Sequence, residues 1–190
     1  MSARAKHANR RIAALLLATI LGVGLLGLSH GASPTRAQQA PDPVAVLQSF
    51  LDARNSGDAL GAAATFTDNA ILVAPPAAGP CSRQSPCIGR PAILANIVSE
   101  IANHQCNTLL DTEVSGSVVT GHAEVRNDGT RANGIERLEL VIMVAVQQGK
   151  IAAQYALLDA TDPQTAAYVA ILAGTQAPGP AIPNPPTPCG

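Results

Sequence analysis

The chain has 190 residues, of which 47% are hydrophobic and 13% are charged, a composition typical of one folded domain. Aromatic residues make up only 2% of it, and proteins that bind single-stranded nucleic acid need such residues to stack on the bases. The formal net charge is −1. Length and composition therefore argue against an enzyme with a separate cofactor domain and against nucleic-acid binding.

Residues 1–37 predict a signal peptide. Four basic residues precede an uncharged, mostly apolar run from Ile12 to Leu28, which is shorter than the about 20 residues that span a bilayer. Small residues follow, and Thr35 and Ala37 suit positions −3 and −1 of a cleavage site. We expect cleavage after Ala37 and a secreted or extracytoplasmic protein, or a membrane-anchored one if the segment is retained.

Loss of this segment would make the remaining domain acidic, because the segment contains basic residues and no acidic ones. Lys150 would be the only lysine left. An acidic domain of this kind is a poor partner for nucleic acid or for an anionic membrane surface. We expect a small or neutral ligand, no cofactor, and no membrane contact after cleavage.

The first half of the domain predicts helices. Asp42 and Asp58 suit helix N-caps, and Pro43 and Pro91 suit first helical positions. Apolar residues then recur at helical spacing, most clearly from Ile93 onwards. The expected elements are a helix over 43–55, a short helix over 58–66, a strand over 70–74 and a helix over 91–103.

The second half changes to strand patterns separated by turn signals. We expect an antiparallel meander over 109–114, 118–127, 134–147 and 151–159, and then a helix from Pro163 that ends at Gly174. Helices followed by strands indicate an α+β domain over 42–173, with the helices packed on one face of a curved sheet. The Pro-rich and Gly-rich residues 174–190 predict a tail without packed structure of its own.

Four cysteines in an exported protein suit two disulfides. Cys81 and Cys87 lie in one short loop and form the easiest pair, which leaves Cys106 for Cys189 by elimination. No metal site is expected, since His104 and Cys106 supply only two of the four ligands of a structural zinc site.

Four short motifs occur in an order and spacing found in one known superfamily. They are Gly57-Asp58, Phe66-Thr67-Asp68-Asn69-Ala70, Gly89-Arg90-Pro91-Ala92-Ile93 and Gly149-Lys150-Ile151. With them the chain resembles the nuclear transport factor 2-like superfamily, and most its SnoaL-like branch, from about residue 43 to 159. The resemblance implies a cone-shaped, cystatin-like α+β fold, in which N-terminal helices pack on a curved antiparallel sheet and enclose a pocket. It also implies a frequent homodimer through the sheet.

The catalytic residues of two enzyme groups in that superfamily are not reproduced. Ketosteroid isomerases use an Asp on the first strand as base, whereas 71–75 contains no acid. The positions used by limonene epoxide hydrolases align with His122, Glu124, Ala156, Leu72 and Ala74, so only the middle-strand pair stays ionisable. Neither mechanism is expected, and whether the protein is an enzyme stays open.

One polar cluster can be predicted from strand periodicity. Period two places His122 and Glu124 on one face of their strand. One register sets Glu124 opposite Arg137 and His122 opposite Glu139, so that His122 is a candidate general acid or base with Glu124 and Glu139 as its carboxylates. The alternative is that this face is simply an exposed or dimer-facing surface of the sheet.

Two functions remain. In the first, the cone binds a small hydrophobic molecule, with isomerase-like, cyclase-like or hydrolase-like chemistry at the polar cluster. In the second, the domain is a non-catalytic module for dimerisation or partner binding, without a pocket of ligand size and with the His122 face covered by a second chain. The residues expected to line the pocket are Leu72, Val73, Ile97, Arg137, Val141, Met143 and Tyr155.

Overall fold

The computed structural model describes residues 42–76, 80–183 and 189. The predicted signal peptide lies outside the described residues. None of the described helices is long and apolar enough to cross a membrane.

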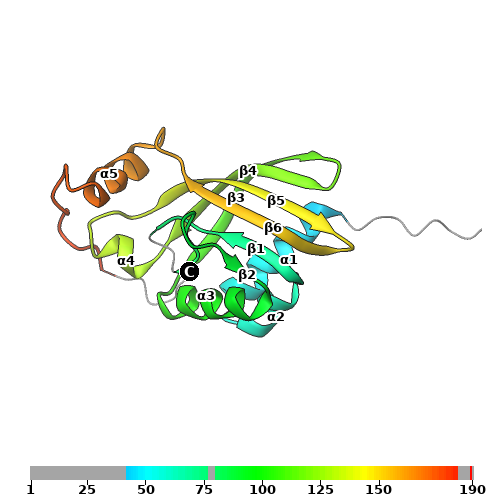
Figure 1. The fold of residues 1–190 in the computed structure, drawn as a ribbon. Coiled ribbons are helices and arrows are strands. Elements are labelled where there is room, and N and C mark those ends of the chain that lie inside the picture. The colour runs from blue at the N-terminus through cyan, green and yellow to red at the C-terminus, as the bar shows by residue number, and fades with distance from the viewer. Residues whose placement is uncertain (1–41, 77–79, 184–188, 190) are drawn as a thin grey trace, which may run out of the picture. The chain divides into compact units, whose positions relative to one another are not determined.

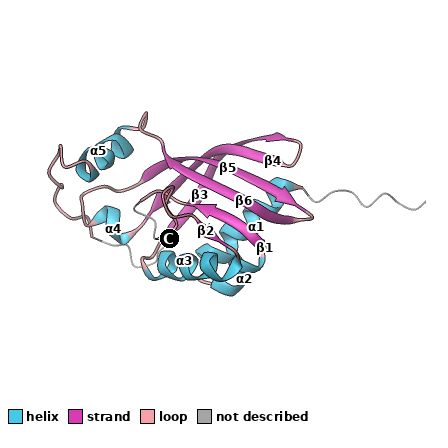
Figure 2. Ribbon diagram, in the orientation of Figure 1, coloured by secondary structure: helices cyan, strands magenta, loops and turns pink. Residues whose placement is uncertain are grey.

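Five helices and six strands make up the described domain (Figures 1 and 2). In chain order they are α1 (Pro43–Asn55), α2 (Ala59–Ala64), β1 (Phe66–Val73), β2 (Cys87–Ile88), α3 (Arg90–Ala102), β3 (Cys106–Ser115), β4 (Val118–Arg126), α4 (Asp128–Arg131), β5 (Leu138–Gln147), β6 (Lys150–Leu158) and α5 (Pro163–Leu172).

The predicted helix starts are confirmed by their caps. The Asp42 side chain accepts a hydrogen bond from the Val44 N–H, and Asp58 accepts one from the Gly61 N–H. Asp162 caps α5 in the same way, through the Thr165 N–H. These carboxylates satisfy backbone donors that have no partner within the helix, which explains why the helices begin where they do.

All six strands form one sheet in the order β2-β1-β6-β5-β4-β3. The predicted meander is confirmed, because β3, β4, β5 and β6 pair antiparallel with their sequence neighbours. β1 lies beside β6 in parallel, so the sheet is mixed rather than wholly antiparallel. The predicted α+β fold class is confirmed, with α1, α2 and α3 on one side of the sheet (Figure 1).

Some element boundaries differ from the prediction. Phe66, expected at the end of a helix, instead begins β1 and packs edge-on against Phe50, with ring centroids 5.1 Å apart. β2 was predicted as loop, and its two residues pair with Ile71 and Leu72. The turn expected after β4 contains the single helical turn α4.

Both predicted disulfides are present, between Cys81 and Cys87 and between Cys106 and Cys189. The described part of the tail after α5 has no helix or strand, and it is hydrogen-bonded to the domain. The N–H groups of Gly179 and Ile182 donate to backbone carbonyls at the end of α4 and just after it. The tail is therefore fastened to the α4 region before it reaches the second disulfide.

A bulge in β3 requires a glycine on the neighbouring strand. The register between β3 and β4 shifts between Leu109 and Asp111. A Cβ atom at Gly121 would overlap the Asp111 carbonyl carbon and oxygen. Only a residue without a side chain therefore fits beside the bulge.

Gly121→Ala should lower the free energy of unfolding by about 1 to 3 kcal/mol, the usual cost of overpacking. Gly116→Ala is the control: its Cβ would meet nothing within 4 Å, although its positive φ adds backbone strain. Urea unfolding measures both variants, and a loss at Gly121 no greater than that at Gly116 would contradict the steric argument.

Candidate functional site

The two faces of the sheet have different surroundings, and the predicted site residues lie mostly on the outer one. Alternate residues of β4 and β5 are buried under the helices, as Val119, Leu140 and Ile142 are. His122 and Glu124 lie on the opposite face, which carries no helix of the α1 to α3 layer.

The predicted pocket therefore needs correction. Val141, Met143 and Tyr155 share the outer face with His122, and Val73 lines a groove there. Arg137 also lies with the outer charged groups. Ile97 is fully buried in the core without lining the inner cavity, so Leu72 is the only predicted ligand-binding residue that lines it. The strand faces were predicted correctly, but the predicted lining residues do not share one site, because some lie on the inner side of the sheet and the others on the outer face.

The predicted register of β4 and β5 is also wrong, by two residues. Glu124 lies opposite Glu139, and His122 lies opposite Val141. Two carboxylates directly opposite each other repel. Arg137 compensates, since its Nε lies 3.5 Å from Glu124 Oε2 and its Nη1 lies 2.9 Å from Glu139 Oε1. Glu124, Glu139 and Arg137 thus lie together, although through a different pairing from the predicted one.

Two aspartates that the sequence analysis missed hold His122. Its Nδ1 lies 3.0 Å from Asp111 Oδ2, and its Nε2 lies 3.8 Å from Asp159 Oδ2. The bulge in β3 brings Asp111 opposite His122, so strand alternation alone could not reveal this contact. The His122 side chain is 41% exposed, so its ring can exchange protons with solvent and does not face an enclosed cavity.

The pKa of His122 is raised above its ordinary value. The hydrogen bond with Asp111 is the main cause, followed by the negative charge of Asp111. Desolvation opposes this rise, and the charges of Asp159 and Glu139 add smaller contributions to it. His104 also lies beside an acid: its Nδ1 is 2.7 Å from Asp128 Oδ2.

The cone interior contains a small cavity between the helices and the inner face of the sheet. Its volume is about 30 Å³, room for one or two waters and far below the several hundred Å³ of a typical ligand pocket. Apolar side chains of α1 and the sheet form much of its wall. The polar residues that also line it are Arg54, Glu100, Gln105, Asn107 and Gln154.

A buried ion pair joins α1 to α3 at this cavity. Arg54 Nη1 lies 2.9 Å from Glu100 Oε2, and both side chains are only 5% exposed. The other oxygen of Glu100 accepts a hydrogen bond from Asn96 Nδ2. A sequence signal existed: Arg54 follows the core residue Leu47, and Glu100 follows Ile93, by two helical turns on the same face.

Several buried polar atoms around this pair have no hydrogen-bond partner among the described residues. They are Arg54 Nε, Asn96 Oδ1, Gln105 Oε1, Asn107 Nδ2 and Gln154 Oε1. Buried polar atoms are normally paired, and an unpaired one costs about 1 to 3 kcal/mol. Because they gather around one cavity, polar groups of water or of a ligand could form hydrogen bonds with them there. No group of three or more candidate ligand side chains for a metal occurs in the described part of the chain.

No protein-family model and no curated protein sequence matches this chain. Solved structures do match its fold. An NTF2-like protein of unknown function from Cytophaga hutchinsonii matches with a TM-score of 0.50 and 10% identity over 65% of this chain and 96% of that one. IdmH, a proposed polyketide cyclase from Streptomyces antibioticus, matches with a TM-score of 0.51 and 19% identity, over 64% of this chain and 94% of that one. A computationally designed 17-OHP binder matches with a TM-score of 0.52 and 17% identity, over 62% of this chain and 90% of that one.

These likenesses identify the class of fold: an α+β domain with helices on one face of a curved sheet. More specifically, this domain has the nuclear transport factor 2-like fold, as the sequence motifs predicted.

The raised pKa of His122 predicts pH-dependent stability. A group whose pKa is higher in the folded state stabilises the fold fully below its unfolded pKa, here about 6.5, and this contribution is lost as pH rises through the folded pKa. Asp111→Asn should reduce that loss, seen as a smaller difference between urea midpoints at pH 5.5 and pH 8. Glu113→Gln, on the same strand, is the control. An unchanged pH dependence in Asp111→Asn would contradict the assignment.

Removing one partner of the buried ion pair should cost much more stability than replacing both partners with apolar residues. Arg54→Met should lower the free energy of unfolding by about 3 to 5 kcal/mol, because it leaves Glu100 buried without a cation. Adding Glu100→Leu should recover much of that loss in urea unfolding. A double variant no more stable than Arg54→Met would contradict the interpretation.

Proposed function

We propose that this domain is the small-molecule-binding part of an exported protein and that its ligand binds in the cone interior. The observation that carries the proposal is the set of unpartnered polar atoms around the cavity beside Arg54 and Glu100. A ligand that supplied their missing hydrogen bonds would offset the cost of burying them. None of these unpartnered atoms belongs to a residue that lines one of the three open grooves on the described surface.

The lining favours an uncharged ligand that both donates and accepts hydrogen bonds. Arg54 and Glu100 neutralise each other, so the site has no charge left for an ion. Arg54 Nε and Asn107 Nδ2 are donors, whereas the free amide oxygens of Gln105 and Gln154 are acceptors. The apolar part of the wall accommodates a hydrophobic body, and a ligand larger than two waters requires the wall to move apart.

Binding is better supported than catalysis. Both oxygens of Glu100 are engaged, by Arg54 and Asn96, so this carboxylate is not free to take a proton from a ligand. His122 and Glu124 lie on the outer face, away from the cavity. The designed protein of the same fold is described as a 17-OHP binder, which supports binding as a role that the fold can serve.

Export is supported by the two disulfides, since such bonds persist in oxidising compartments. The homodimer remains a prediction. The surface that would serve it is the outer face of the sheet, where Met143 is 48% exposed and Val141, Tyr155 and Leu157 are exposed beside it. The small cavity also agrees with the alternative function, a non-catalytic interaction module.

Native mass spectrometry of the protein purified from the exported fraction of its own host tests the proposal. We expect a cleaved chain that carries a small molecule, and we expect Gln154→Leu to lose most of it because an acceptor is removed. Gln147→Leu, at an exposed position at the end of β5, should retain it. An empty wild-type protein, or equal loss in both variants, would contradict cone binding.

A further inference from the structure

A second concave site lies on the outer face of the sheet, away from the cone interior. It is a groove of about 390 Å³ between the sheet and the loop that precedes β2, a volume within the range of ligand pockets. Ile88 is 68% exposed at this site. The apolar residues that line the groove are Ile71, Val73, Ile88, Met143, Tyr155 and Leu157.

The wall opposite the sheet is fixed in place. The Cys81–Cys87 disulfide closes the loop, and the Ala74 N–H donates a hydrogen bond to the Cys81 carbonyl, at 2.6 Å. β2 pairs with β1 at the other end of the loop. Arg83 and Pro86 stand on the wall between these attachments, so the groove is formed before any ligand arrives.

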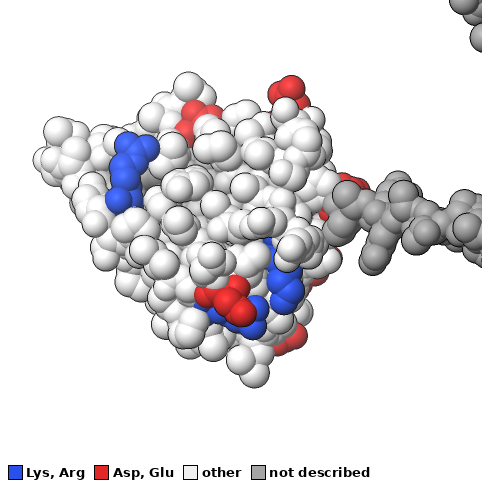
Figure 3. Space-filling model, turned by 45° about the vertical axis from the view of Figure 1, so that its right-hand side comes forward, with Lys and Arg blue, Asp and Glu red and all other residues white. Residues whose placement is uncertain are grey.

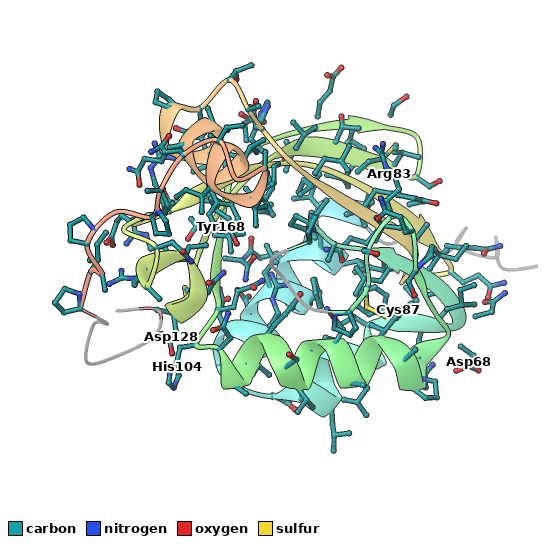
Figure 4. All side chains as sticks on the ribbon, turned by 60° about the vertical axis from the view of Figure 1, so that its left-hand side comes forward. Asp68, Arg83, Cys87, His104, Asp128 and Tyr168 are labelled. Carbon is teal, nitrogen blue, oxygen red and sulfur yellow. A yellow bond between two sulfur atoms is a disulfide. The ribbon has the colours of Figure 1, made fainter. Side chains whose placement is uncertain are left out.

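Arg83 lies where this groove meets a second one. The second groove, of about 370 Å³, shares Val73, Arg83 and Leu157 with the first and continues past Pro75. Figure 4 shows Arg83 and Cys87, and Arg83 lies on the loop that leads into Cys87, the first residue of β2. Arg83 makes no ion pair or side-chain hydrogen bond with any residue that the structure describes.

Charge sets the chemistry of the ligand. Arg83 is the only charged residue among those lining either groove. Charged side chains are also sparse across the face of the molecule shown in Figure 3. One cation beside a long apolar surface complements one anion on an apolar body, and a guanidinium suits a carboxylate particularly well because it can donate two parallel hydrogen bonds.

We propose that this outer groove binds an amphipathic monocarboxylate of the fatty-acid type, with its carboxylate on Arg83 and its chain along the apolar strip between Ile88 and Met143. A second charge on the ligand would find no partner, and an uncharged chain would leave Arg83 unused. The proposed binding strip is distinct from the cone, since no residue that lines the first groove lines the inner cavity, although the second groove shares Ala74 and Pro75 with that cavity.

Dodecanoate below its micelle concentration is the probe, added to the disulfide-bonded protein with ¹³C-labelled Ile and Met methyl groups. We expect saturable shifts of the Met143 and Ile88 methyl signals, with the signal of Ile142, which is buried and lines the inner cavity, unchanged. Arg83→Gln should weaken binding by about tenfold, corresponding to one charge-assisted hydrogen-bonded contact. Lys150→Gln removes an equal charge outside the groove and should leave the affinity unchanged.

Dodecanol separates the carboxylate contact from general apolar adsorption. If dodecanol binds as tightly as dodecanoate, or if Arg83→Gln binds dodecanoate normally, the proposal is wrong. It is also wrong if the shifts occur at Ile142 instead, which would place the ligand in the cone. A stable dimer by light scattering that excludes dodecanoate would assign the groove to a second copy instead. Failure of cone binding leaves these outcomes unaffected, because they are read at Met143 and Ile88.

Discussion

The alternation of side chains along the strands, together with a helical layer on only one face of the sheet, controls where every site on this domain can lie. Successive residues point to opposite faces, and α1 and α3 cover one of them. Leu140 and Ile142 are buried as a result, while Val141 and Met143 between them remain exposed. One strand therefore contributes to two unrelated surfaces, an enclosed cavity and an open groove.

The inner surface combines core packing with polarity that core packing does not need. Phe50 contacts Phe66 and also lies under the Arg54 guanidinium, whose carbon is 4.7 Å from the ring centroid. A buried ion pair often stabilises a protein less than apolar residues of the same size would. Stability alone therefore does not account for Arg54 and Glu100 amid Leu and Ile side chains, whereas the proposed binding role would give this polarity a use.

The disulfides act at the edges of the sheet. Cys81–Cys87 fixes the loop beside β2 and so shapes the outer groove. Cys106–Cys189 attaches the tail to the first residue of β3, between Gln105 and Asn107, both of which line the inner cavity. The two crosslinks therefore stand next to the two candidate sites, at opposite edges of the sheet.

The sequence by itself determined the features that depend on near neighbours: the caps at Asp42, Asp58 and Asp162, the alternation along β4 and β5, and the Cys81–Cys87 pair within one loop. The pairing of Cys106 with Cys189 was predicted only by elimination. The motifs around the helices and strands also identified the fold. Tertiary structure decided the register, because a bulge in β3 places Asp111 against His122. It also decided the site, because Arg54 and Glu100 are 46 residues apart and meet only when α1 and α3 pack on the same face of the sheet. Local patterns show which side chains share a face, whereas packing alone determines which face is covered.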